Sequence, residues 1–214
     1  IAEKLNITKQ AYGYYENGKR KLVPAAAQAC VDEGTDPTTI LNTMIGAMDV
    51  VGDKFKRNEI FVPEMLIAAK AMKAGVEVIK PLLATAGAPQ LGTVVIGTVY
   101  GDLHDIGKNL VAMMIESAGF TVVDLGVDVP VQKFIDAYEE NEDVKIFAVS
   151  ALLTTTMPAM EETVAALNAA PFRDKVKVMV GGAPITQEFA DKIGADCFTA
   201  DAASAAAAAK ELVA

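Results

Sequence analysis

The sequence of 214 residues contains one histidine, two cysteines and no tryptophan. Cys30 and Cys197 are too few and too far apart for a disulfide framework or a cysteine-based zinc site, so a cytoplasmic protein is the simplest expectation. The apolar runs have the length of strands, too short to cross a membrane, and we expect no signal peptide. Chemistry that requires an imidazole therefore has a single candidate, His104.

The negative charge is concentrated in the C-terminal part of the chain. The formal net charge is −9, but residues 1–88 carry 11 basic and 10 acidic side chains, a balance of +1. Residues 89–214 carry 8 and 18, a balance of −10. An acidic surface repels a phosphate backbone, which makes nucleic acid an unfavourable partner for this part.

The N-terminal part is predicted to be helical. The pair Asp36-Pro37 is typical of a helix N-cap followed by the first helical position. Apolar residues in 40–55 recur at helical spacing, and Pro63 is expected to open a second helix. A third helix is expected at 75–86, interrupted by Pro81.

A linker of small residues at 86–92 separates an all-α helical-bundle cap domain, residues 1–88, from a second domain, residues 89–214. In the second domain, short β-branched runs alternate with helix-length segments. The runs lie at 93–98, 121–125, 145–150, 176–180 and 197–199, and the helical segments at about 105–118, 130–140, 157–169, 184–193 and 202–213. This alternation predicts an α/β fold with a flavodoxin- or Rossmann-like five-stranded parallel sheet of order 2-1-3-4-5.

In such a sheet, ligands bind beyond the carboxyl ends of the strands, where the winding reverses. The loops at 101–107 and 150–156 and the pair Gly181-Gly182 follow the first, third and fourth strands, so they should meet at that edge. The first of these loops contains His104.

The pattern Asp102-x-His104-x-x-Gly107 has a physical interpretation. The imidazole can bind a metal, Asp102 can accept the other ring N–H, and Gly107 permits close approach of a bulky group. With no second histidine or cysteine nearby, such a metal would take its remaining ligands from a macrocycle, haem or corrin. Structural alternatives stay open: a hydrogen-bonded loop histidine, a helix N-cap at Asp102 or Asp105, and a tight turn at Gly181-Gly182.

Residues 93–129 resemble the cobalamin-binding domain of corrinoid methyltransferase proteins and of methionine synthase. The likeness has three parts in order, each after an expected strand: Asp102-x-His104-x-x-Gly107, Ser150-x-Leu152 and Gly181-Gly182. Residues 35–83 resemble the helical cap of the same proteins through Met44, Val51-Gly52, Phe55, Glu59 and Phe61-Val-Pro-Glu64. The chain as a whole resembles the small corrinoid proteins of methylotrophic methyltransferase systems.

The resemblance implies a role for each matching residue. His104 would be the lower axial ligand of cobalt, Asp102 would hydrogen-bond to its ring, and Thr156, a serine in methionine synthase, would extend the chain. Phe61 and Met65 would cover the upper face of the cobalt. Further cofactor contacts are expected from Leu103, Asp105, Ile106, Gly107 and Leu152, and contacts with the displaced nucleotide tail from Ser150, Thr154, Gly181, Gly182, Ala200 and Asp201. Asn58 stands where the family usually has glycine, a difference expected to affect a turn.

The resemblance also implies a function, that of a methyl carrier that is not catalytic alone. A substrate-specific methyltransferase would load a methyl group onto cob(I)alamin, giving methylcobalamin, and a second methyltransferase would pass it to a thiol or to tetrahydrofolate. A reductive reactivation protein would rescue oxidised cobalt. The donor, whether methanol, a methylamine, a betaine or a methoxylated compound, is left open.

Three other functions share parts of this pattern. An adenosylcobalamin-dependent mutase subunit has the histidine loop but normally lacks the cap. A cobalamin-sensing transcription regulator would give a purpose to residues 1–23, which resemble part of a helix-turn-helix and carry a charge of +3. The regulators with this architecture use cap tryptophan and histidine, which this chain lacks. A flavodoxin- or response-regulator-like module would share the fold alone.

Overall fold

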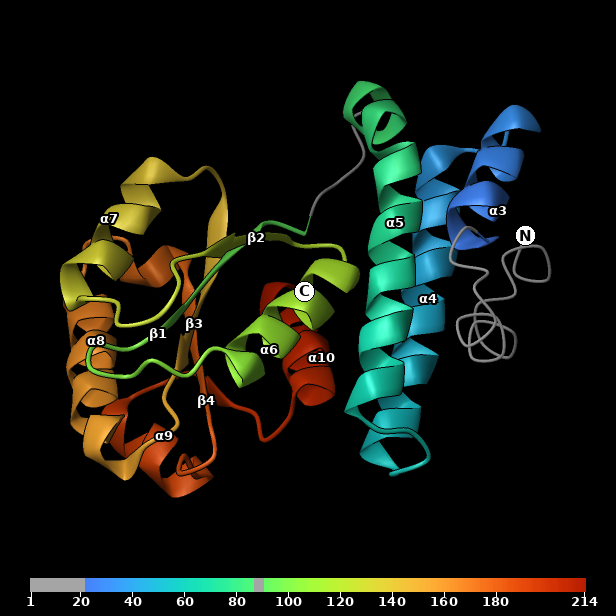
Figure 1. The fold of residues 1–214 in the computed structure, drawn as a ribbon. Helices are drawn as coiled ribbons and strands as arrows, with labels where there is room; N and C mark the ends of the chain where they lie inside the picture. Colours follow the sequence, from blue (N-terminus) through green and yellow to red (C-terminus); the bar gives the residue numbers. More distant parts are fainter. Residues whose placement is uncertain (1–21, 87–90) are drawn as a thin grey trace. The chain divides into compact units, whose positions relative to one another are not determined.

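The computed structural model describes residues 22–86 and 91–214 (Figure 1). Residues 1–21, which carry nearly all of the helix-turn-helix-like sequence, lie outside the described residues. The chain divides into two compact units, one of residues 1–90 with 117–119 and the other of residues 91–116 with 120–214.

The N-terminal unit contains the helices α3 (Leu22–Asp32), α4 (Pro37–Lys56) and α5 (Val62–Ala86). The expected N-cap of α4 is confirmed, because a carboxylate oxygen of Asp36 accepts the backbone N–H of Thr39 at 2.8 Å. At the start of α5, Glu64 accepts the backbone N–H of Phe61 at 2.9 Å. Between the two helices Asn58 has a φ of 57°. Asparagine adopts this left-handed conformation more readily than most residues, so it can replace the glycine of the family at this turn.

The separate third helix expected at 75–86 is wrong, because α5 runs without a break from Val62 to Ala86 with Pro81 inside it. Proline removes one backbone hydrogen bond, but packing of the apolar face can hold a helix together through such a position. Gly75 belongs to that packing. A Cβ there would lie 2.9 Å from both Met44 Cε and Val23 Cγ1, so the glycine marks close contact among the three helices rather than a helix boundary.

The C-terminal unit is built on a five-stranded parallel sheet, and its order β2-β1-β3-β4-β5 confirms the expected topology. The strands are β1 (Thr93–Thr98), β2 (Thr121–Asp124), β3 (Val144–Ser150), β4 (Lys177–Gly181) and β5 (Cys197–Phe198). Every residue of β1 is buried, as expected for a central strand covered on both faces.

Helices cover both faces of the sheet. Figure 1 shows α7, α8 and α9 on one face and α6 and α10 on the other. Their bounds are α6 (Ile106–Ser117), α7 (Val131–Glu140), α8 (Met157–Ala169), α9 (Gln187–Ile193) and α10 (Ala202–Val213), with short 3₁₀ helices at Thr154–Thr156 and Arg173–Lys175. The core between the sheet and α7 and α8 includes Phe134, Phe147, Met160 and Leu167. None of the helices in the described ranges is long and apolar enough to span a membrane.

Candidate cofactor-binding site

Asp102 joins two loops at the carboxyl edge of the sheet. Its Oδ1 lies 2.7 Å from Nδ1 of His104 in the loop after β1. Its Oδ2 accepts the Thr156 hydroxyl at 2.8 Å and the backbone N–H of Leu152 at 2.7 Å, both from the segment after β3. Asp102 therefore contacts both residues that the resemblance placed with it in one hydrogen-bonded chain.

The Asp102 side chain is fully buried, and its surroundings favour the ionised form. Burial acts to raise the pKa of this carboxyl. The hydrogen bonds from the Leu152 N–H, the His104 ring, the Thr156 hydroxyl and the His104 N–H outweigh burial and hold the pKa of Asp102 well below its usual range. The site thus contains a fixed negative charge that accepts hydrogen bonds and does not donate them.

That charge determines which ring nitrogen of His104 is available. A carboxylate only accepts, so Nδ1 carries the proton of the 2.7 Å bond and the neutral ring has its lone pair on Nε2. The side chain of His104 is 49% exposed, which leaves the ring open to a ligand. This is the arrangement of a metal-binding histidine oriented by a carboxylate.

Hydrogen bonds from neighbouring residues hold the loop of this histidine in place. Thr98, the last residue of β1, donates its hydroxyl to the carbonyl of His104 at 2.9 Å. Gly101 has a φ of 79°, a conformation that favours glycine, and its N–H reaches Oδ1 of Asp128 at 2.7 Å. Sequence reasoning missed Thr98 and Asp128. The one signal for Thr98 was a polar residue at the end of a buried strand.

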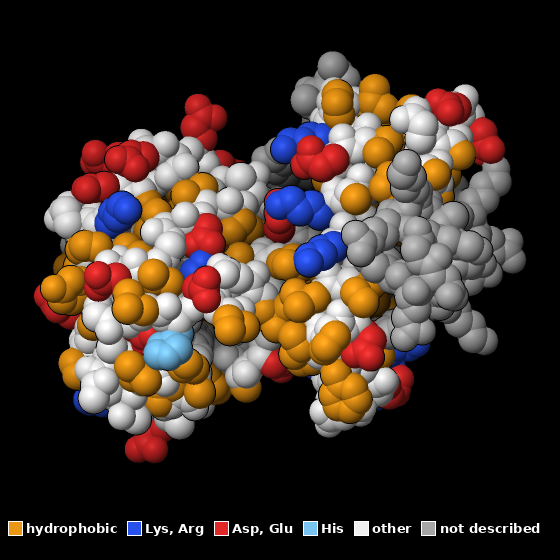
Figure 2. Space-filling model, viewed as in Figure 1, with side chains coloured by type: hydrophobic (Ala, Val, Ile, Leu, Met, Phe, Trp, Pro, Cys, Tyr) orange, Lys and Arg blue, Asp and Glu red, His pale blue; other side chains and the backbone are white. Residues whose placement is uncertain are grey.

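The surface around the histidine is apolar. Leu103 is 72% exposed and Ile106 is 82% exposed, on either side of His104 in sequence. Tyr100, Leu152 and Leu153 are also exposed. Figure 2 shows the histidine at the surface with hydrophobic side chains beside it. Large apolar side chains left in solvent on several adjacent loops indicate a surface that binds an apolar group.

Gly107 lies in the first turn of α6, and packing in the protein does not require it. A Cβ there would meet nothing within 4 Å, and its backbone is not left-handed. Alanine is favoured over glycine inside a helix by about 1 kcal/mol. The contacts within the protein therefore do not explain the glycine, and close approach of a bound group at Gly107 stays a prediction.

Gly181 and Gly182 differ in what they contact. A Cβ on Gly182, where φ is 134°, would overlap the carbonyl oxygen of Ala151. A Cβ on Gly181 would lie 3.2 Å from the carbonyl oxygen of Thr199. The loop after β3 packs closely on the end of β4, and this contact accounts for the glycine at 182. The expected role of Gly182 in a channel for the nucleotide tail stays a prediction.

The remaining expected tail contacts lie at the same edge or have structural partners of their own. Ser150 is half-buried at the end of β3 and pairs in register with Thr98 and Gly181. Thr154 is exposed in a 3₁₀ turn, and Ala200 is exposed before α10. Asp201 is the N-cap of α10, with its carboxylate on the N–H and hydroxyl of Ser204.

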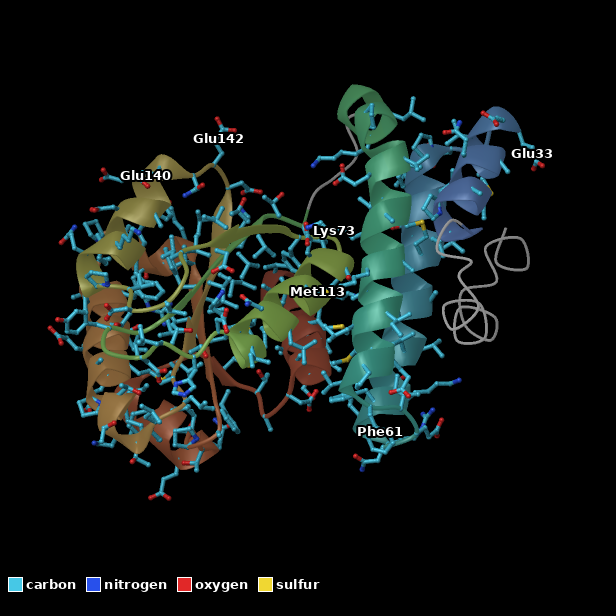
Figure 3. The ribbon with its side chains drawn as sticks, in the orientation of Figure 1. Glu33, Phe61, Lys73, Met113, Glu140 and Glu142 are labelled. Atoms are coloured by element: carbon cyan, nitrogen blue, oxygen red, sulfur yellow. The ribbon has the colours of Figure 1, made fainter. Side chains whose placement is uncertain are left out.

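The two residues expected to cover the cobalt differ in exposure. Phe61 is 64% exposed at the turn between α4 and α5 (Figure 3). Met65, one turn further along α5, is fully buried. Their role above the cobalt stays a prediction.

Comparison with known proteins decides the family. The model of the B12 binding domain matches residues 92–210, and a second B12-binding-domain model matches residues 12–80. The chain belongs to the B12-binding corrinoid proteins. Dimethylamine corrinoid protein 1 of Methanosarcina acetivorans is 46% identical to this corrinoid protein over 199 residues, which is 92% of each chain.

Two solved structures are similar to this corrinoid protein along its length. A cobalamin-binding protein from Desulfitobacterium hafniense matches with a TM-score of 0.79 and 31% identity, covering 98% of each chain. A chain of the methanol:cobalamin methyltransferase complex of Methanosarcina barkeri matches with a TM-score of 0.78 and 30% identity, covering 99% of this chain and 83% of that one. The Rossmann-like fold with its N-terminal helical domain is thus shared with corrinoid proteins.

The described residues of this corrinoid protein fit a corrin. Within the described ranges no three His, Cys, Asp or Glu side chains form a group that could hold a metal ion, so a metal bound at His104 would need its other ligands from a cofactor. A corrin supplies the other ligands of its own metal, so one oriented imidazole is sufficient. The exposed Leu103 and Ile106 and the open space at Gly107 suit the broad apolar body of such a cofactor.

Proposed function

We propose that this corrinoid protein is the methyl-carrying subunit of a methyltransferase system. The observation that supports this most strongly is the Asp102–His104 pair, which presents one oriented ring nitrogen on an exposed apolar surface. The relationship to a chain of a methanol:cobalamin methyltransferase complex supports a methyltransferase as its partner. Among the donors left open by the sequence, a methylamine is favoured, because the 46% identical relative is a dimethylamine corrinoid protein.

The residues of the chain would bind the cofactor and control its axial ligand. When bound, the cobalt supplies the nucleophile that takes up the methyl group and the centre that gives it up again. Nε2 of His104 would bind the cobalt, and Asp102 would keep the proton on Nδ1.

Several finer roles belong to the same proposal. Ser150, Thr154, Gly181, Gly182 and the Ala200-Asp201 pair would contact the displaced nucleotide tail, and Phe61 would shield the upper face. An acceptor methyltransferase, using a thiol or tetrahydrofolate, and a reductive reactivation protein would be further partners. Such a system would operate in the cytoplasm.

Transfer of a labelled methyl group tests the proposal. The chain is reconstituted with cobalamin, reduced, and incubated with radiolabelled dimethylamine and a purified dimethylamine methyltransferase. We expect label on the isolated holoprotein, dependent on that methyltransferase, and much less label with methanol and a methanol methyltransferase. A holoprotein that takes label from neither donor, nor from mono- or trimethylamine with their methyltransferases, would refute the carrier function.

A further inference from the structure

A segment outside the sequence motif contacts the backbone on both sides of Asp102. Residues 124–129 include the last residue of β2 and most of the connection to α7. Within this segment, Asp128 accepts the N–H of Gly101 through Oδ1 at 2.7 Å. The N–H of Asp128 donates to the carbonyl of Asp102 at 2.9 Å. One residue thus bonds the peptide group before Gly101 and the peptide group after Asp102, the aspartate that orients His104.

Asp128 makes these bonds in an unusual backbone conformation. Its φ is 54°, in the left-handed region, which is unfavourable for a residue with a Cβ. Asp128 is exposed, so burial of its side chain does not offset this cost. Strained residues persist where the surroundings over-determine them, and they cluster at functional sites.

The ends of the segment are anchored to the elements that precede and follow the His104 loop. Thr98 donates its N–H to the Gly126 carbonyl at 3.0 Å, and its own carbonyl accepts the N–H of Val129 at 3.0 Å. At the other end, Asp124 forms an ion pair with Lys108 of α6, with an Nζ to Oδ1 distance of 2.6 Å. The side chain of Lys108 is 2% exposed.

The position of Lys108 is notable because it places a cation in the first turn of a helix, where the helix dipole is unfavourable to positive charge. Asp124, with Oδ1 of Asn109 at 2.7 Å, compensates that cation. The ion pair therefore joins segment 124–129 to α6, after His104, and the bonds to Thr98 join it to β1, before His104.

We propose that Asp128 is a positioning residue for the axial ligand: it holds the Gly101–Asp102 backbone so that the Asp102 carboxylate presents Nε2 of His104 to the cobalt. This inference rests on the proposed cofactor role of His104. Without the Asp128 carboxylate, the Gly101 N–H loses its partner and the Asp102 backbone gains freedom. The fraction of protein with His104 bound to cobalt then falls.

Three substitutions separate this role from a general effect on folding. Asp128→Asn keeps a side-chain oxygen that can accept from Gly101 and tolerates the left-handed conformation. Asp128→Gly relieves the strain but removes the acceptor, and Asp128→Ala removes the acceptor and keeps the strain. Asp143 provides a matched control, because it has a φ of 53° and lies before β3, at the opposite edge of the sheet.

The measurements are the corrinoid dissociation constant and the electron paramagnetic resonance spectrum of the cobalt(II) form made with isotopically labelled histidine, in which the part of the nitrogen splitting that changes with the label reports an axial histidine. We expect Asp128→Gly and Asp128→Ala to bind the corrinoid about tenfold more weakly, with a reduced nitrogen-split component, as is typical for partners that orient a metal ligand. Asp128→Asn and Asp143→Gly should resemble the unsubstituted protein. Because Asp128→Gly relieves strain, it keeps the test possible if Asp128→Ala does not fold.

The results distinguish this inference from the proposed function. If the unsubstituted protein shows the nitrogen splitting and accepts methyl groups while Asp128→Gly has the same spectrum and affinity, Asp128 is not a positioning residue and the function stands. A weakened affinity shared equally by Asp128→Asn or by Asp143→Gly would also overturn the inference. An unsubstituted protein without the splitting would overturn this inference, whereas the carrier function would still be judged by the transfer of labelled methyl groups.

Discussion

Asp102 and Thr156, 54 residues apart in sequence, are joined by a hydrogen bond of 2.8 Å between a carboxylate and a hydroxyl, both buried. The bond connects the loop after β1 to the segment after β3 and leaves the other carboxylate oxygen to His104. The orientation of the imidazole therefore depends on contacts between the segments that follow two neighbouring parallel strands. Mutations at Asp102 should affect both folding and cofactor binding.

The free energy of unfolding should depend on pH in a way that reflects the ionised Asp102 carboxylate. Its pKa in the folded protein lies below that in the unfolded chain, about 3.9 for an aspartate. As the pH falls below about 5, the unfolded chain binds more protons than the folded one, so the stability contributed by this carboxylate is complete above that pH and is lost progressively below it.

Comparison with Asp102→Asn isolates this contribution from the other carboxylates. The side chain of asparagine has one oxygen and one NH₂ group where aspartate has two oxygens. Whichever way the amide is turned, its NH₂ group faces a backbone N–H, that of Leu152 or that of His104, and cannot accept a hydrogen bond from it. We expect a loss of about 2 kcal/mol in the free energy of unfolding near neutral pH. In denaturant titrations, the difference between the two proteins should shrink between about pH 5 and pH 3. A difference that stays constant over that range would contradict the assignment.

Gly107→Ala should separate cofactor binding from folding. The added methyl group meets no protein atom and favours the helix, so the apoprotein should be unchanged or up to about 1 kcal/mol more stable. Corrinoid affinity, measured by absorbance titration, should fall because the methyl group occupies space that we expect the cofactor to fill. Unchanged affinity would show that the glycine has no role in binding.

Gly182→Ala and Gly181→Ala form a matched pair at the end of β4. The first places a methyl group on the Ala151 carbonyl in an unfavourable backbone conformation, so we expect a loss of at least about 3 kcal/mol or failure to fold. The second has a contact of 3.2 Å that a small shift can relieve, and it should cost about 1 kcal/mol. Thermal unfolding of the two apoproteins measures the loss of stability in each variant. Equal losses of stability would rule out the contact with Ala151 as the reason for the glycine at 182.

The parts of the site that the sequence predicted follow from local pattern and sheet topology. Alternating strands and helices were sufficient to give the order 2-1-3-4-5, and that order places the ends of β1, β3 and β4 at one edge. The spacing of Asp102 and His104 gave their pairing, because two residues in one loop can bond without knowledge of the rest of the fold.

The parts that the sequence did not predict depend on tertiary contacts. Gly101 and Asp128 are 27 residues apart, and nothing near either position indicates their bond. The Lys108–Asp124 pair crosses from α6 to β2 in the same way. In the helical unit, Pro81 suggested an interruption by a local rule, whereas α5 continues through it and packs on its neighbours around Gly75.

The central claim is that Nε2 of His104 binds the cobalt, and the single histidine of the chain allows a direct test. The protein is produced with isotopically labelled histidine, reconstituted with cobalamin and reduced to cobalt(II), and its electron paramagnetic resonance spectrum is compared with that of unlabelled protein. We predict that the nitrogen splitting changes on labelling and that His104→Ala loses the protein-derived component. A splitting that is insensitive to the histidine label, and unchanged in His104→Ala, would contradict the account.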